Sequence, residues 1–463
     1  MVTAFSAINY TAFSGEVFSQ GLYVALAVPV FVFVAFPITR IVMPFFHSMR
    51  LVSAYDYLER RFDIRVRCLA SGIFIVWRLL WMATALFVPC KVLSDITGWN
   101  LYGLMLMGGA AAIVYTVAGG MRAVMWTDVA QFFVLFGGLA LALFVASART
   151  RGGLAGIFQS AAEGGLLRPF YPYDPAMLSP DPRIRITLWS AWIGTFTAFL
   201  ARYGADQAIL QRYFSARSLR DAQRGFWLSV AAAIFSLACL AVLGFAMHAA
   251  FLDSGSAPAV PPIEFFARFV REMPFGICGL LVAGLFAATM SSIDSGINSC
   301  SAAFMNDFYQ PISRRSMSAT VAEAGLDEDE SEAELLSLSR WLALGFGALA
   351  MGMASYIILL EQSIFEIANR IINASGSPLL ALFLIAMFSR RANSLGVLIG
   401  GILGFAWSVG VSLTVENLAL HYYAVVNLAG TLALCWMASA IVGMWTEKPP
   451  AEKIAWTWWE RRK

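Results

Sequence analysis

Residues 226–247 have the sequence FWLSVAAAIFSLACLAVLGFAM, which contains no charged side chain. A helix needs roughly 20 mostly apolar residues to cross the hydrocarbon core of a bilayer, so this stretch is long enough to span a membrane. Comparable apolar runs recur along the chain, and short polar links separate them. These runs lie at residues 22–36, 101–117, 129–145, 275–290, 341–360 and 379–387.

The composition agrees with a protein that lies mostly within lipid. Hydrophobic residues make up 59% of the 463 residues and charged residues only 13%, which is more apolar surface than a soluble domain can bury. About a dozen spans fit into this length, and little remains for a soluble domain. We therefore expect an all-α polytopic protein of the cell membrane, surrounded by the lipid bilayer. The formal net charge of +3 gives no indication of nucleic-acid binding, because most charges lie in the links.

Basic residues between the expected helices indicate their orientation. Arginines and lysines cluster at 50–67, 212–224 and 390–391, and again after residue 448. All of these fall on one side if each segment crosses once, and the positive-inside rule assigns that side to the cytoplasm. The link 149–186 carries arginines on the opposite side, but long links weigh little in this rule. The expected segments are 2–18, 20–46, 66–95, 99–120, 124–148, 187–213, 220–251, 275–304, 337–360, 364–389, 393–415 and 421–445.

The chain offers neither the nucleophile nor the metal constellation that an enzyme needs. Its 6 cysteines lie in or beside apolar runs without a CxxC pair, so we interpret them as small core residues. Its 3 histidines are scattered. We expect a protein that is not an enzyme.

Residues 288–299 are unusually polar for an apolar run. Several of their side chains share one stripe of a helix, close to the carboxylate of Asp294. Hydroxyl oxygens with one carboxylate suit a small hard cation better than a transition metal. The alternative is a close helix-packing face, which also uses small residues. The stripe consists of Ser291, Ser295, Asn298 and Ser299.

A second polar stretch follows the pair Gly119 and Gly120. We expect the two glycines to end one helix and the next helix to begin within a few residues. Asp128 and Gln131, one turn apart, would then enter the membrane together. The alternative for Asp128 is a helix cap or a partner of the helix dipole.

Two of the expected spans are interrupted by polar residues and glycine. An interrupted span is tolerated only where it faces a cavity, and a pair of such spans at corresponding places in two halves is typical of a transporter's binding site. The two spans are five apart in order. The first contains Ser6, Asn9, Thr11, Ser14 and Gly15, and the sixth contains Arg202, Tyr203, Gly204, Asp206, Gln207 and Gln211.

Four motifs in this order resemble the sodium/solute symporter family over residues 5 to about 401. They are YDYLERRF at 55–62, GGMRAVMWTDVAQ at 119–131, DQAILQRY at 206–213 and SSIDSGINS at 291–299. The resemblance implies a core of five plus five helices arranged as inverted repeats, with extra C-terminal helices. The first repeat would occupy 1–148 and the second 149–389, followed by further transmembrane helices at 390–445 and a cytoplasmic tail at 446–463.

The resemblance also implies a sodium site between the first and eighth core helices. Ser291 and Ser292 would supply hydroxyl ligands, and Val2, Phe5 and Ala288 would supply backbone carbonyls. A second cation site, present in some members, would use Asp128 together with Asp294 and Ser295. The implied activity is symport of a small organic solute with sodium by alternating access.

The expected solute contacts come from the interrupted spans and the tenth span. Sugar-carrying members place a glutamate where this chain has Val28 and a lysine where it has Ala233, which argues against a hexose. Arg370 and Arg202 are cationic groups near the expected pocket, so a carboxylate-bearing solute is favoured. Snorkelling to the inner interface is the alternative for Arg202. The candidate contacts are Asn9, Tyr203, Asp206, Gln207, Asn369, Arg370 and Asn373.

Members of the family usually have a further helix before the first core helix, whereas this chain starts at Met1 almost inside that segment. We therefore expect the first repeat to be incomplete at its N-terminus. Two alternatives remain open for the function. Asp128 or Asp294 could carry a proton in place of sodium, or the protein could sense a solute rather than move it.

Overall fold

The computed structural model describes residues 8–49, 51, 53–214, 216–254, 262–311, 328–357, 364–446 and 448–461. Within these residues the chain is almost wholly helical and has no β-strand beyond an isolated bridge between Phe170 and Tyr173. Nine stretches of the described chain are long and apolar enough to cross a membrane. The predicted all-α, multi-pass membrane fold is therefore confirmed.

The first two expected segments, 2–18 and 20–46, are parted at Gly21. This residue ends α1 (Ser14–Gln20) at a φ of 72°, which favours glycine. A Cβ atom there would also lie 2.7 Å from the carbonyl oxygen of Leu166. The elements on either side are η2 (Asn9–Phe13), η3 (Gly21–Ala27), α2 (Val30–Pro37), η4 (Ile38–Val42) and α3 (Met43–His47).

The long helix α5 (Ile64–Thr97) follows the short helix α4 (Asp56–Arg61), which lies in a link predicted to be cytoplasmic. It begins where the Asp63 side chain accepts hydrogen bonds from two backbone N–H groups, a typical N-cap. It ends at Gly98, which has the left-handed conformation common after a helix.

One expectation in this region was wrong: Gly119 and Gly120 do not end a helix. The helical backbone continues through them as α6 (Leu101–Arg149), and the two expected spans follow one another within it at Leu101–Ala118 and Trp126–Arg149. Glycine inside a helix costs only about 1 kcal/mol relative to alanine, so two glycines need not interrupt one.

The sixth expected span is interrupted, as predicted, but at Asp206 rather than at Gly204. Asp206 has an extended backbone between α8 (Thr195–Ala205) and α9 (Gln207–Phe214), whereas Gly204 lies inside α8. The π-helical turn η6 (Ser190–Gly194) precedes α8, and α10 (Leu219–Ser254) follows α9.

The remaining elements complete the bundle. They are α7 (Gly153–Glu163), η5 (Pro175–Leu178), α11 (Pro262–Arg271), α12 (Phe275–Phe304), η7 (Met305–Tyr309), α14 (Glu328–Ile357), α15 (Ile364–Phe388), α16 (Ser394–Thr414), α17 (Tyr422–Gly443), α18 (Ala451–Ile454) and α19 (Trp458–Arg461).

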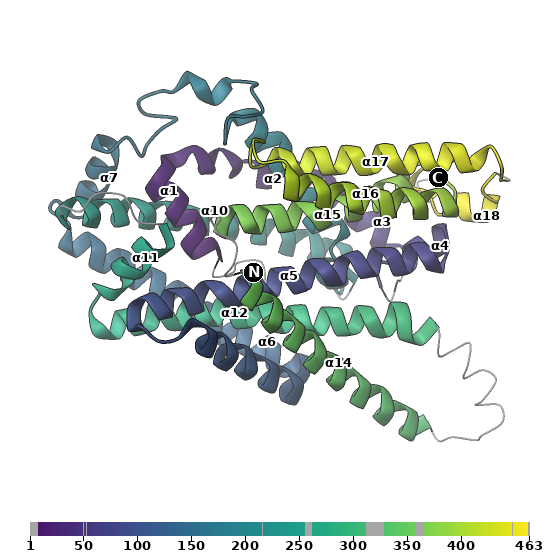
Figure 1. Ribbon diagram of the computed structural model, residues 1–463, viewed down its shortest axis with the longest axis horizontal. Coiled ribbons are helices and arrows are strands. Elements are labelled where there is room, and N and C mark those ends of the chain that lie inside the picture. The colour runs from purple at the N-terminus through teal and green to yellow at the C-terminus, as the bar shows by residue number, and fades with distance from the viewer. Residues whose placement is uncertain are drawn as a thin grey trace.

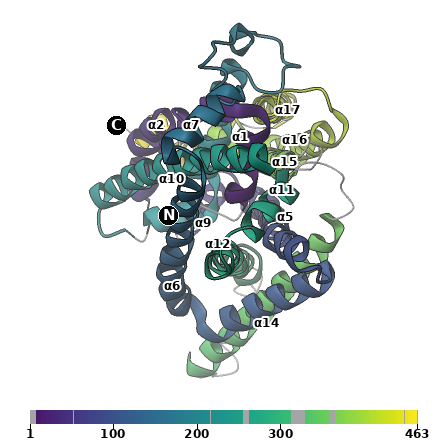
Figure 2. The same ribbon diagram turned by 90° about the vertical axis from the view of Figure 1, so that its left-hand side faces the viewer.

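The long helices run along the longest axis of the molecule (Figure 1). Helix α12 packs against α5 and α6, and Figure 2 shows it end-on between them. Helices α15, α16 and α17 form a second group, and α15 joins it to α5 and α8. Helices α4 and α18 lie together at one end, which is the predicted cytoplasmic end (Figure 1).

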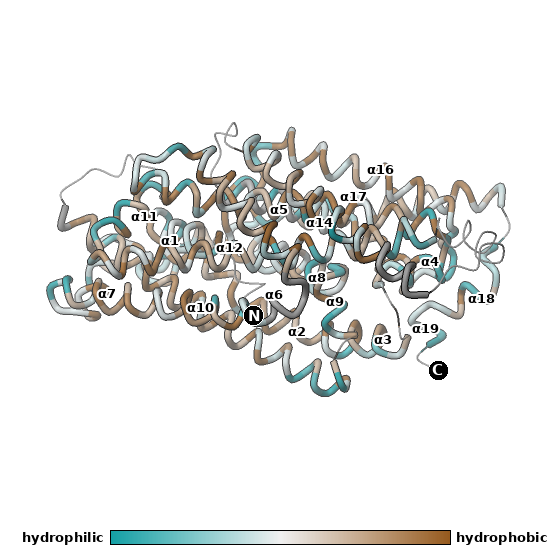
Figure 3. The backbone as a smooth tube through the Cα atoms, turned by 90° about the horizontal axis from the view of Figure 1, so that it is seen from below, coloured by the Kyte–Doolittle hydropathy of each residue, from teal (hydrophilic) through white to brown (hydrophobic). Residues whose placement is uncertain are grey.

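Large apolar side chains remain exposed along the outer helices. Phe133 and Phe144 on α6, Leu228 and Phe235 on α10, and Leu413 on α16 are each more than two-thirds exposed. Figure 3 shows long hydrophobic stretches along the helices and hydrophilic segments at α4 and α18. Apolar exposure on this scale is unfavourable in water and is expected for a surface that faces lipid tails.

Candidate functional site

A cavity of about 520 Å³ lies between the interrupted spans. The first segment with η2, the neighbouring α2, and helices α5, α8, α9 and α10 all contribute to its walls. Its size falls within the range of small-molecule sites. The side chains used below are Asn9, Phe31, Arg78, Trp81, Phe199, Arg202, Tyr203, Arg212, Asp221, Phe226 and His421.

Three arginines from three different helices line this cavity. Arg78 comes from α5, Arg202 from α8 and Arg212 from α9. Arg202 lies over the ring of Trp81, with 5.6 Å from the guanidinium carbon to the ring centroid. Among the lining residues the acidic side chain is Asp221, so the walls carry an excess of positive charge.

Asp206, which does not line the cavity itself, binds Arg78. Its Oδ1 accepts a hydrogen bond of 2.6 Å from the Arg78 guanidinium and another of 2.9 Å from the N–H of Ala208 at the start of α9. Both charged side chains are almost fully buried, with exposures of 9% and 2%. The break in the sixth span thus brings a carboxylate to a buried cation.

Aromatic rings form the apolar part of the walls. The rings of Phe31 and Phe199 lie 4.2 Å apart between centroids, and Tyr203 packs edge-on against Phe226 at 5.0 Å. A few polar groups such as the Asn9 amide and the His421 imidazole face the same space. Apolar walls with a small number of polar groups are typical of sites for organic solutes.

Two of the predicted cation ligands meet where α12 packs against α6. The Ser291 hydroxyl donates a 2.5 Å hydrogen bond to Oδ1 of Asp128. The side-chain oxygen of Gln131, one turn further along α6, is buried and has no hydrogen-bond partner within the described residues. An unpaired buried oxygen is uncommon, and here it lies one turn from a carboxylate.

The other predicted cation ligands on α12 have partners within the protein. The Ser292 hydroxyl donates to the carbonyl of Ala288 at 3.0 Å, and the Ser295 hydroxyl donates to the carbonyl of Ser292 at 3.2 Å. Asp294 accepts a 2.7 Å hydrogen bond from Thr116 and another from Tyr115. Asp128 of α6 therefore accepts from a hydroxyl of α12, whereas Asp294 of α12 accepts from two hydroxyls of α6.

Several predicted solute contacts lie away from the cavity. Gln207 is fully buried, and its Oε1 accepts a 2.7 Å hydrogen bond from the N–H of Ala54. Arg370 donates to the carbonyl of Ser412 at 3.3 Å and lies over the Tyr423 ring. The carbonyl of Asn373 accepts from Asn427 at 3.2 Å.

The two N-terminal carbonyl ligands, Val2 and Phe5, fall outside the described residues, and so does the side chain of Asn369. Of the seven predicted solute contacts, Asn9 and Tyr203 line the cavity directly. Asp206 reaches it through Arg78.

The sequence interpretation missed Arg78. It lies in the middle of an apolar run, and a charged side chain inside a span is by default a candidate for function. The same rule was applied to the sixth and tenth spans, and it would also have found this residue.

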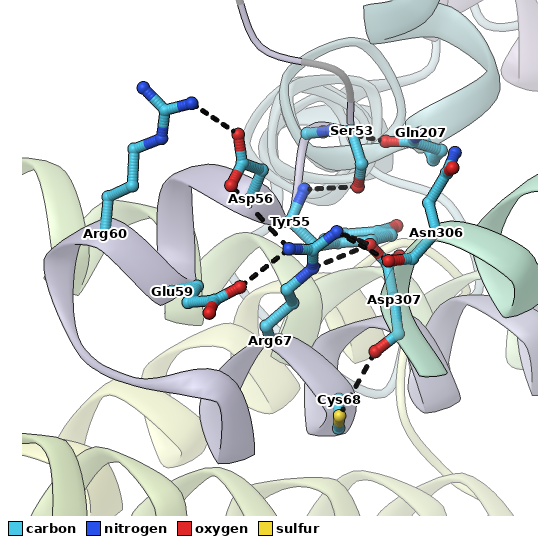
Figure 4. Close-up of polar contacts among 11 residues, drawn as sticks. Ser53, Tyr55, Asp56, Glu59, Arg60, Arg67, Cys68, Gln207, Asn306 and Asp307 are labelled. Atoms are coloured by element: carbon cyan, nitrogen blue, oxygen red, sulfur yellow. Dashed lines mark hydrogen bonds and ion pairs between the residues drawn. The ribbon is translucent and has the colours of Figure 1, made fainter. Parts of the chain in front are cut away.

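A polar cluster centred on Arg67 lies at the predicted cytoplasmic end, and Figure 4 shows its contacts. The Arg67 guanidinium contacts Glu59 of α4 at 2.6 Å, Asp307 of η7 at 2.8 Å and the backbone carbonyl of Asn306 at 2.9 Å. Because Arg67 itself belongs to α5, the cluster ties α4, α5 and the end of α12 together. Four of the residues drawn in Figure 4 belong to the YDYLERRF motif.

Comparisons with known proteins agree with the motifs. The model of the sodium:solute symporter family matches residues 1–404. The sodium-dependent multivitamin transporter of Oryctolagus cuniculus is 31% identical over 86% of this chain and 59% of its own length. The sodium-coupled monocarboxylate transporter 1 of Homo sapiens is 28% identical over 88% of this chain and 64% of its own length. The chain thus spans about three-fifths of the length of these relatives.

Other relatives are closer in length, and a solved structure shares the fold. The sodium/sialic acid symporter SiaT of Proteus mirabilis is 28% identical over 95% of this chain and 86% of its own length. The structure of a substrate-bound, outward-open Na⁺-coupled sialic acid symporter superposes with a TM-score of 0.80 at 22% identity, covering 95% of this chain and 88% of that one. This likeness confirms the predicted transporter fold. Because the family model covers most of the sequence, the chain belongs to the sodium:solute symporter family.

Proposed function

We propose that this protein imports a small organic anion together with sodium, and that the cavity between the interrupted spans is the solute site. The observation that carries the proposal is the positive charge of that cavity. Within the described residues, its lining contains three arginines, Arg78, Arg202 and Arg212, but only one acidic residue, Asp221. Guanidinium groups pair with carboxylates in a forked geometry. We assign the solute's carboxylate to Arg202 and Arg212, which reach the cavity from the two halves of the interrupted sixth span.

The sodium ion would bind at the α6–α12 contact. Asp128, Ser291 and Gln131 supply carboxylate, hydroxyl and amide oxygens there, and hard oxygen ligands suit a hard cation. This site takes Asp128 from the predicted second cation site, in which Asp294 and Ser295 remain its predicted companions. It takes Ser291 from the predicted sodium site between the first and eighth core helices, in which the carbonyl of Ala288 and the hydroxyl of Ser292 remain predicted ligands.

Helix α9 supports coupling between the two sites. It contacts α12, which carries the serine ligands, and it carries Arg212 of the cavity. Sodium bound to α12 would therefore favour one position of α9. By linkage the solute must raise sodium affinity by the same factor by which sodium raises solute affinity. Each charge moved inward would add roughly 2.3 kcal/mol per 100 mV of membrane potential.

Uptake by proteoliposomes tests the proposal. We expect accumulation of one or more organic anions from a panel of carboxylates under an inward sodium gradient, and its loss when potassium replaces sodium. Arg202→Gln should lower uptake at least tenfold, because a charge-assisted hydrogen bond contributes about 1.5–3 kcal/mol. Arg340→Gln, an exposed arginine of α14, is the matched control and should leave uptake unchanged.

Two outcomes would contradict parts of the proposal. Uptake that is unaffected by removing sodium but follows the pH gradient would replace sodium with a proton. Equal uptake by the Arg202→Gln variant and the control would remove the cavity arginine from the solute site. Arg370→Gln tests the sequence prediction that Arg370 contacts the solute. Because Arg370 lies outside the cavity, unchanged uptake by this variant would remove it from the solute site.

A further inference from the structure

We propose that a groove at the predicted cytoplasmic end of α15, α16 and α17 binds the headgroup of an anionic phospholipid. The groove has a volume of about 320 Å³ and lies far along the chain from the solute cavity. None of its lining residues also lines that cavity in the described structure. The lining residues are Phe388, Ser389, Arg390, Arg391, Trp436 and Trp459.

Two adjacent arginines supply positive charge at the mouth of the groove. Both are exposed. The Arg390 guanidinium forms an ion pair with Glu460 at 2.7 Å, and its side chain remains 52% exposed. Arg391 has no ion pair or hydrogen bond within the described residues. The predicted orientation places both at the cytoplasmic leaflet, where anionic lipids attract basic groups.

The turn that carries these arginines is held firmly from inside. Arg61, which is fully buried, donates to the backbone carbonyls of Ser389 at 2.6 Å and Ala386 at 3.3 Å. The side chain of Asn393 caps α16 by accepting from the N–H of Gly396 at 2.8 Å. The groove therefore has a fixed backbone, and only the two arginine side chains need to adjust to a ligand.

Two tryptophan rings also line the groove. Trp459 is anchored by its indole N–H, which donates to the carbonyl of Phe388 at 3.0 Å. Trp436 of α17 is 67% exposed and lies seven residues before the end of that helix, about 10 Å deeper along its axis. Tryptophan prefers the boundary between headgroups and acyl chains.

The groove thus combines two arginines with two tryptophan rings, one of which lies deeper along α17 in the predicted membrane. Helix α16 also carries the exposed apolar side chains Leu395, Ile399 and Ile402, all at least 39% exposed. A phospholipid has the same arrangement, with a phosphate above and acyl chains below. Free phosphate shares the headgroup chemistry but would leave the exposed tryptophan rings uncovered, so a lipid is the occupant that matches both the arginines and the tryptophans of the groove.

Native mass spectrometry of the purified full-length chain tests this inference. The delipidated protein is titrated with phosphatidylglycerol or with phosphatidylcholine of the same chain length. We expect one phosphatidylglycerol to bind at least tenfold more tightly than phosphatidylcholine, since each basic group near the surface contributes about 1 kcal/mol. The double variant Arg390→Gln/Arg391→Gln should lose this preference. Arg217→Gln/Arg220→Gln, which removes two exposed charges from the same predicted side, should keep it.

Two single variants and a competing ligand show whether the groove binds a lipid or only phosphate, and whether any loss of binding comes from misfolding. Arg391→Gln alone breaks no ion pair or hydrogen bond within the described structure, and it should lower phosphatidylglycerol affinity severalfold. This single variant keeps the test valid even if the double variant misfolds. Trp436→Ala should weaken phosphatidylglycerol binding while inorganic phosphate fails to compete. The inference is overturned if phosphate displaces the lipid, if wild-type protein shows no preference for phosphatidylglycerol, or if the control variant loses as much affinity as the groove variants.

Discussion

Asp206 combines two tasks at the break between α8 and α9. It accepts a hydrogen bond from the Ala208 N–H at the start of α9, and it neutralises Arg78 beside the cavity. An ion pair that is buried to this extent contributes little net stability compared with apolar residues, but loss of one partner leaves a buried charge uncompensated. The geometry of the cavity wall therefore depends on both members being present.

We expect Asp206→Asn to lower the free energy of unfolding by about 3–5 kcal/mol, because Arg78 would keep its charge without its carboxylate. Thermal unfolding of the purified protein in detergent measures this change. The double variant Arg78→Gln/Asp206→Asn should recover part of the loss, since it removes both charges. Asp181→Asn in an exposed link is the control, and an equal effect of the two single variants would contradict the role of the pair.

At this scale the sequence predicted residue types better than residue partners. Asp128 and Ser291 were predicted as ligands of two different cations, yet the Ser291 hydroxyl donates to Oδ1 of Asp128 at 2.5 Å. Arg370 was predicted to face the pocket, yet it contacts Ser412. A polar residue inside a span is visible in the sequence because of its cost in lipid. The direction in which it points depends on the packing of helices that are distant in the chain, which no local pattern encodes.

Among the helices, α16 and α17 form the most closely approached pair. Three glycines spaced four apart, Gly396, Gly400 and Gly404, form one stripe of α16. A Cβ atom added to any of them would lie 2.4 Å or less from an atom of α17. Small residues at this spacing let two helix backbones approach within a membrane, where packing rather than the hydrophobic effect drives association.

Two alanine substitutions on the same helix isolate this packing. At Gly400 a Cβ atom would meet the backbone of Cys435 at 2.3 Å, whereas at Gly410 it would meet nothing within 4 Å. Both changes gain helix propensity equally, so their difference reports the contact alone. We expect Gly400→Ala to be less stable than Gly410→Ala by about 1–3 kcal/mol, measured by thermal unfolding. Equal stability of the two variants would show that α16 and α17 do not pack in this way.

The sequence predicted the helical segments but not all of their ends. Apolar runs separate well from polar links, so most expected spans match an observed helix. The Gly119–Gly120 pair was misjudged, because helix-breaking residues cost too little to end a helix by themselves. The break in the sixth span lies at Asp206, whose carboxylate binds Arg78 of α5. That contact joins residues 128 positions apart, and a local pattern cannot reveal it.

In the whole molecule, ion pairs tie helices together at both predicted membrane faces. Arg67 joins α4, α5 and η7 at the cytoplasmic end. At the outer end Arg185 contacts Glu16 of α1 at 2.5 Å and Glu366 of α15 at 3.4 Å. The hydrogen bond with Glu16 raises the pKa of Arg185 above its usual value, so this arginine stays charged.

Alternating access requires that the two faces open in turn, so each set of ion pairs must loosen in one of the two states. We expect Arg67→Gln to open the cavity toward the cytoplasm and Arg185→Gln to open it toward the outside. A cysteine placed at Ala198, which lines the cavity, reports both changes through its reaction with a membrane-impermeant maleimide. The chain without this cysteine gives the background from the 6 native thiols.

Vesicles of opposite orientation distinguish the two faces. The Arg67 variant should label severalfold faster than its parent only when the reagent reaches the cytoplasmic face, and the Arg185 variant only when it reaches the outer face. Sodium should shift the parent toward outer labelling, because the ion is expected to favour the outward-open state. Two variants that accelerate labelling from the same face, or from both faces equally, would show that these clusters hold the fold together without controlling access to the cavity.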